Sequence, residues 1–273
     1  MREHGYIEGR NIVLEFRLAQ GDYNALPRLV SELVSLPVDV LVTDGGPGVA
    51  KLAKDATQQI PIVMGTSGGD PVASGLVTSL SRPGGNVTGL TLMQRELSAK
   101  RVDLLKAALP NAKAITILMN PANAGTETNF HASEEAARTA GLVITRIEAA
   151  TPSALHALQP GQIHGPLLVL PDAMLWNERR VILAWATAAR VPGVFPEREY
   201  ADEGGLIAYG PNVPANFRRA AAYVDRILKG ASAGDLPVEE PAKLDFVVNL
   251  KAARGLGILL PDNFVARADE VIE

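Results

Sequence analysis

Along the first ninety positions, apolar residues recur at helical spacing in some segments and form continuous runs in others. Segment 24–36 carries Leu and Val on one face at three- and four-residue spacing, which predicts a helix. Runs rich in Val, Ile and Leu at 38–43 and 60–64 predict buried strands, and 11–17 is a further strand candidate. A short helix is expected over 47–56, because it begins with proline, which suits a first helical turn.

The same alternation continues to the end of the chain. Further strands are expected at 86–92, 114–120, 142–147, 166–170, 193–195, 205–209 and 244–248. Further helices are expected at 97–109, 126–140, 152–158, 176–189, 215–229, 249–256 and 262–271. Strands that alternate with helices indicate parallel sheets joined by right-handed crossovers. The pattern therefore predicts an α/β fold of two lobes, the first formed by 1–91 plus 200–233 and the second by 92–199 plus 234–273.

Four of the predicted strands end in small, polar or proline residues. The segments are LVTDGGP (41–47), IPIVMGTSGGDP (60–71), ITILMNPANA (115–124) and LLVLPDAM (167–174). In open α/β sheets, ligands bind just beyond the carboxyl ends of the strands. The sequence therefore predicts a binding cleft built from strand ends, rather than a catalytic centre.

In the first half of the chain, the candidate binding residues are glycines, hydroxyls and one carboxylate. Gly45 and Gly46 open a helix, where free amides attract a carboxylate, although a tight turn also requires glycine. The hydroxyls of Thr66 and Ser67 are predicted to contact a ligand carboxylate. Asp70 either holds a ligand ammonium group or caps the helix that follows it.

In the second half, the candidates are two polar residues and several large apolar ones. Asn120 either bonds the ligand or caps the next turn. Asp172 ends an apolar strand and is the candidate partner of a ligand amine, with helix capping as the alternative. An apolar sub-pocket, with a tyrosine hydroxyl as its polar contact, is predicted from Met174, Trp176, Phe195 and Tyr209, for which core packing is the alternative.

Composition excludes several classes of function. The net charge of the 273 residues is −4 and no basic run exceeds two residues, which argues against nucleic-acid binding. The absence of cysteine excludes thiol catalysis, disulfides and cysteine metal sites. The four histidines lie far apart, and no phosphate loop, dinucleotide fingerprint or nucleophile elbow occurs, so no metal, cofactor or catalytic residue is expected. No apolar stretch is long enough to span a membrane.

Long segments of the chain resemble one family, the periplasmic substrate-binding proteins of ABC transporters. The matching motifs include HGYIEGRNIVLEFR (4–17), GGDPVASGLVTSLSRPGGNVTGLT (68–91), EREYADEGGLIAYGPN (197–212) and VVNLKAARGLGILLP (247–261). More narrowly, they are similar to the branch whose characterised members bind aromatic amino acids. The resemblance implies the type I fold, in which two Rossmann-like lobes joined by a hinge of several crossings close on a small ligand. It also implies an ABC permease as partner and a location in the periplasm or anchored outside the cytoplasm.

The resemblance also suggests that the chain is truncated at its N-terminus. Family members usually begin with an export signal or lipoprotein cysteine, followed by a strand and most of a helix before the GY-EG-N motif. Here that motif stands at the start of the chain. A first lobe without this strand would expose an unpaired sheet edge, so lower stability and association through the first lobe are expected.

Three hypotheses about function follow. The leading one is a solute receptor of an ABC importer that binds an amino acid, an aromatic one included, or a related small carboxylate. The second is an enzyme on a doubly wound α/β fold with Asp70 and Asp172 as its acid–base pair, which the lack of a recognisable catalytic motif disfavours. The third is the effector-binding domain of a transcription regulator, which shares the architecture.

Overall fold

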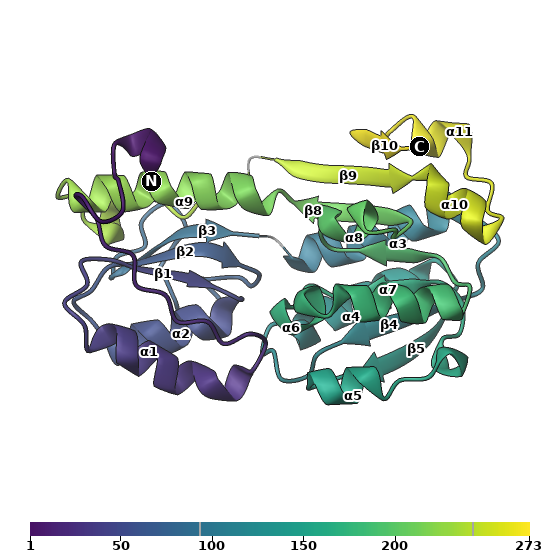
Figure 1. Cartoon of the computed structure of the whole chain (residues 1–273), viewed down its shortest axis with the longest axis horizontal. Helices are drawn as coiled ribbons and strands as arrows, with labels where there is room; N and C mark the ends of the chain where they lie inside the picture. The colour runs from purple at the N-terminus through teal and green to yellow at the C-terminus, as the bar shows by residue number, and fades with distance from the viewer. Residues whose placement is uncertain (93, 242) are drawn as a thin grey trace. The chain divides into compact units, whose positions relative to one another are not determined.

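Two α/β units make up the fold, and the chain passes from one to the other after Met93, Asn212 and Ala242 (Figure 1). The computed structural model describes residues 1–92, 94–241 and 243–273. Unit 1 comprises Met1–Met93 and Val213–Ala242, and unit 2 comprises Gln94–Asn212 and Lys243–Glu273. Within the described residues, no helix combines the length and apolarity needed to cross a membrane.

Unit 1 is built on a parallel sheet with the strand order β1-β2-β3. Its strands are β1 (Leu41–Asp44), β2 (Ile62–Ser67) and β3 (Val87–Thr91), and its longer helices are α1 (Leu26–Val34), α2 (Pro47–Ala56) and α9 (Val213–Leu228). Side chains of a strand alternate between the two faces of its sheet. Ile62 and Met64 accordingly pack with residues of α1 and α2, whereas Val63 packs with residues of α9. Both faces of the sheet are therefore covered, which explains why β2 is wholly buried.

Unit 2 contains a larger sheet with the strand order β10-β9-β8-β7-β6-β4-β5. Its strands are β4 (Ala114–Met119), β5 (Val143–Glu148), β6 (Leu167–Val169), β7 (Gly193–Phe195), β8 (Ile207–Pro211), β9 (Leu244–Asn249) and β10 (Glu270–Ile272). Its helices are α3 (Gln94–Ala108), α4 (Thr126–Thr139), α5 (Pro152–His156), α6 (Ala173–Asn177), α7 (Arg179–Ala188), α8 (Arg198–Asp202), α10 (Leu250–Leu256) and α11 (Asp262–Val265). Pairing is parallel except between β8 and β9. The predicted α/β class with parallel sheets is thus confirmed.

The division into units differs from the predicted lobe boundaries. Residues 200–212 belong to unit 2, because β8 pairs with both β7 and β9. Residues 234–242 belong to unit 1, because Glu239 bridges to Leu90 of β3, and the carbonyl of Leu236 accepts a bond of 2.7 Å from the Thr88 hydroxyl. An extended segment can join either sheet, and its sequence does not identify the partner.

Two other predictions are wrong in detail. Segment 11–17 forms no strand, and its Ile12 takes part only in an isolated bridge to Glu8. Without a sheet partner its apolar side chains remain in solvent, and Phe16 is 66% exposed. At the C-terminus, the helix expected over 262–271 ends early, and the chain continues as β10, which pairs with β9.

Gly89 of β3 lies against β2 in unit 1 and leaves no room there for a side chain. Its φ is +121°, and a Cβ atom there would lie 2.3 Å from the carbonyl oxygen of Met64. Gly89→Ala is therefore expected to lower the free energy of unfolding by roughly 2–4 kcal/mol, through backbone strain and steric overlap. Gly85→Ala is the control, because its Cβ would meet open space. Urea unfolding measures both, and equal effects would contradict the assignment.

Candidate functional site

Gly45 and Gly46 connect β1 to α2 with backbone angles that favour glycine. Their φ values are +103° and +99°. The amide of Gly46 donates to the carbonyl of Thr66 at 3.3 Å, and no side chain caps α2. The turn itself therefore requires both glycines, and their contact with a ligand remains a prediction.

The two hydroxyls at the end of β2 have different surroundings. The Thr66 hydroxyl donates to the carboxylate of Asp44 at the end of β1. The Ser67 side chain is 1% exposed, and its hydroxyl has no hydrogen-bond partner among the described residues. The sequence did not distinguish these hydroxyls, and it gave no reason to single out Asp44.

Asp70 uses its carboxylate to cap the turn that follows it. One carboxylate oxygen accepts bonds from the amides of Val72 at 2.8 Å and Ala73 at 3.1 Å. This is the capping role that was the alternative to ligand binding.

In unit 2, Asp172 is the centre of a buried polar cluster at the ends of β4 and β6. Its carboxylate accepts bonds from the side-chain amides of Asn120 at 3.1 Å and Asn123 at 3.0 Å. It also caps α6 through the amide of Leu175 at 3.0 Å. These three bonds hold the carboxylate in place at the ends of the two strands. Asn123 was missed, although it stands in the same NPAN segment as Asn120.

The predicted apolar residues divide between core and surface. Met174 is fully buried, and the Phe195 ring stacks on Tyr200 with 4.8 Å between centroids, so both have the contacts of core residues. Tyr209 keeps partial exposure while its ring contacts Phe246 edge-on at 6.0 Å. Trp176 is 36% exposed. Met174 and Phe195 have no part in the ligand binding that we propose.

Arg101 of α3 is a fully buried cation that the sequence prediction missed. Its Nε donates to the carbonyl of Tyr209 at 2.7 Å, and its Nη2 donates to Gln94 at 3.1 Å. Burial lowers the pKa of Arg101 to about 10, so the side chain stays protonated at neutral pH. Its place on the apolar face of α3, level with Leu97 and Leu105, was the available signal.

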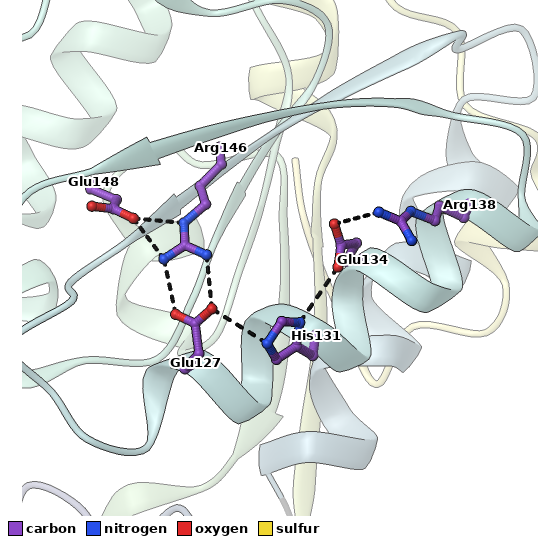
Figure 2. Close-up of polar contacts among 6 residues, drawn as sticks. All are labelled: Glu127, His131, Glu134, Arg138, Arg146 and Glu148. Atoms are coloured by element: carbon purple, nitrogen blue, oxygen red, sulfur yellow. Dashed lines mark hydrogen bonds and ion pairs between the residues drawn. The ribbon is translucent and has the colours of Figure 1, made fainter.

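A groove on unit 2 between α4 and β5 carries a separate group of charged residues. Figure 2 shows Glu127, His131, Glu134, Arg138, Arg146 and Glu148 linked by ion pairs and hydrogen bonds. Arg146 binds Glu127 at 2.8 Å and Glu148 at 2.6 Å, and its guanidinium lies 4.5 Å from the centroid of Phe130. The charges are paired within an exposed network, which is typical of a solvated surface.

Metal coordination has no candidate cluster in the described part of the chain. No three His, Asp or Glu side chains of residues 1–92, 94–241 and 243–273 are placed to hold an ion. The polar groups at the strand ends can instead bind a small molecule by hydrogen bonds and charge.

Comparison with known proteins identifies relatives over almost the whole chain. A family model described as ABC transporter substrate binding protein matches residues 1–272. A tyrosine-binding protein of Clostridioides difficile is 27% identical over 260 residues, which cover 94% of this chain and 74% of that protein. The structure of a conserved domain protein from Vibrio cholerae matches with a TM-score of 0.89 and 29% identity, covering 99% of this chain and 90% of that one.

A further solved structure shares the fold. It is an ABC domain from Streptococcus pneumoniae in complex with L-Trp, with a TM-score of 0.84, 24% identity, and coverage of 99% of this chain and 92% of that one.

Asp172→Ala is expected to destabilise unit 2 strongly. The substitution removes the cap of α6 and leaves the side-chain amides of the buried Asn120 and the half-buried Asn123 without their acceptor, at a cost of roughly 2–5 kcal/mol. Asp70→Ala removes a cap on an exposed turn and should cost about 1 kcal/mol or less. Urea unfolding of the two variants measures the difference, and similar losses would contradict the structural role of Asp172.

The Glu127–Arg146 pair predicts a pH dependence. The bond from Arg146 holds the pKa of Glu127 below its ordinary value of 4.5. The stability due to this pair is therefore present above the unfolded-state pKa and is lost as the pH falls through the folded-state pKa. Glu127→Gln should flatten the decline of melting temperature between about pH 5 and pH 3, whereas Glu135→Gln, on the same helix, should not. Parallel curves for both variants would refute this assignment.

Proposed function

The chain belongs to the ABC transporter substrate-binding protein family, and we propose that it is the solute receptor of an importer whose ligand is an aromatic amino acid. Members of the family bind substrates and are not enzymes, which removes the acid–base role considered for Asp70 and Asp172. The capping bonds of both carboxylates agree with this. The transcription-regulator hypothesis has no support in the family match.

The observation that carries the proposal is the buried carboxylate of Asp172. A buried charge is costly unless it meets donors or an opposite charge. Asn120, Asn123 and the amide of Leu175 donate hydrogen bonds to this carboxylate, and an ammonium group is a ligand group of the opposite charge. An α-amino acid carries such a group next to a carboxylate, for which the end of β2 in unit 1 offers the hydroxyl of Ser67.

The relatives support the aromatic class of ligand. One related protein is named for tyrosine, and a structural neighbour was solved with L-Trp. Tyr209 and Trp176 retain exposed surface in unit 2 and are suited to contact an aromatic side chain. Receptors of this family close two lobes on their ligand, and the ligand favours the closed state because it binds that state more tightly.

The family also indicates where such a receptor works. Substrate-binding proteins of ABC transporters act outside the cytoplasm and deliver their solute to membrane permease subunits. We therefore expect an ABC permease as the protein partner and an extracytoplasmic location for this chain.

Ligand binding should be measurable as a thermal shift. Protein that has been unfolded, dialysed and refolded to remove bound solute is screened with L-Tyr, L-Trp and L-Phe. At a hundredfold excess over Kd, a ligand adds roughly 2.7 kcal/mol to the free energy of unfolding. The D-enantiomers and D-ribose serve as controls for stereochemistry and for a sugar ligand. A shift with the sugar and none with any amino acid would overturn the proposal.

A further inference from the structure

Two buried polar groups in unit 1 have no partner within the described residues. They are the hydroxyl of Ser67 and the side-chain amide nitrogen of Asn216, whose residues are 1% and 4% exposed. A buried polar group without a hydrogen bond costs about 1–3 kcal/mol, and such groups are rare in folded proteins. Each therefore calls for a partner that this part of the chain does not supply.

The packing of α9 on β2 places both groups at one end of unit 1. Asn216 lies in the first turn of α9, on the buried face that continues through Ala220 and Tyr223. The ring of Phe217 lies 3.0 Å from the Cβ position of Gly65, and Val63 packs with Ala220 and Tyr223. The strand therefore runs toward the start of the helix, and Figure 1 shows the first turn of α9 beside the carboxyl ends of β2 and β3.

The chemistry of the pair fits an anion. A serine hydroxyl donates one hydrogen bond and an asparagine NH2 group can donate two, so the pair offers a donor for each of the two oxygens of a carboxylate. The positive end of the dipole of α9, a helix of 16 residues, lies at the same end. Thr66 does not compete for this role, because its hydroxyl donates to Asp44.

We infer that Ser67 and Asn216 form the carboxylate subsite of the ligand within unit 1. The inference rests on the proposed function and makes it more specific, because it selects one of two neighbouring hydroxyls and adds a residue of α9. An amino acid bound in this way has its carboxylate on unit 1.

Matched ligands and variants test the subsite by titration calorimetry. L-tyrosine carries a carboxylate and L-tyrosinamide carries a neutral amide in its place, so the wild type should bind L-tyrosine about tenfold to a hundredfold more tightly. Asn216→Asp places a negative charge in the subsite and should remove this preference. Ser67→Ala should weaken L-tyrosine binding about tenfold and affect L-tyrosinamide less.

Stability separates a binding role from a structural one. Ser67→Ala and Asn216→Leu delete groups that lack partners, so the melting temperature of the ligand-free protein should stay equal or rise while affinity falls. Asn86→Asp is the matched control, because Asn86 donates to the carbonyls of Thr57 and Ile60, and its loss should lower stability without changing Kd. Trp185→Phe removes another unpartnered buried group, in α7 of unit 2, and should leave Kd unchanged.

The outcomes distinguish failure of this inference from failure of the proposed function. Equal binding of L-tyrosine and L-tyrosinamide, affinities within twofold of wild type in both subsite variants, or a ligand-bound crystal structure in which a buried water satisfies Ser67 and Asn216 would overturn the subsite. If no amino acid binds, the proposed function fails. The subsite is then tested with 3-(4-hydroxyphenyl)propionate, a carboxylate without an amine: binding that Asn216→Asp abolishes supports it, and the absence of binding overturns it.

Discussion

This structure depends on one constraint: buried polar groups at the carboxyl ends of parallel strands must find hydrogen-bond partners. Apolar strands can be buried on both faces, but each must end where polar backbone and side chains find partners. In unit 2, the carboxylate of Asp172 meets this requirement by accepting bonds from Asn120, Asn123 and the amide of Leu175. The same three bonds fix the end of β4, the end of β6 and the start of α6 relative to one another.

Both units contain buried polar groups that meet this constraint, and both contain buried polar groups without a partner among the described residues. Asp172 is surrounded by donors, and Arg101 in the same unit bonds the carbonyl of Tyr209 and the side chain of Gln94. In unit 1, Ser67 and Asn216 are buried without partners among the described residues. A protein that leaves such groups unpaired loses stability in the free state, and a ligand that pairs them regains it. The bonds of Asp172 have a structural role within unit 2, whereas Ser67 and Asn216 have no partner among the described residues, and a ligand carboxylate is the partner that we propose for them.

Much of the fold could be predicted from the sequence, because it is recorded in local patterns. The apolar runs before Gly65, Asn120 and Pro171 are strands, and the spacing of apolar residues along 215–229 identifies α9. The sheet partners of segments that pair with distant parts of the chain could not be predicted as well. Segment 11–17 has the composition of a strand but no sheet neighbour, and 205–211 had two sheets that it could join. Both outcomes depend on pairing with residues far along the chain, which no local pattern specifies.

The candidate site shows the same division between position and role. The strand ends and the candidate Asp172 could be predicted from the sequence, because a polar residue after an apolar run is a local signal. Whether a given polar group is free to bind is decided by neighbours distant in sequence: Asp44 takes the hydroxyl of Thr66, while nothing in the described residues takes that of Ser67. Asn216 was missed because an asparagine in the first turn of a helix usually indicates capping. Its burial against β2 becomes visible only when α9, which follows β3 by more than a hundred residues, packs on the sheet of unit 1. Candidate ligand contacts therefore have to be sought by accounting for each buried donor and acceptor, a step for which strand and helix patterns supply only the starting positions.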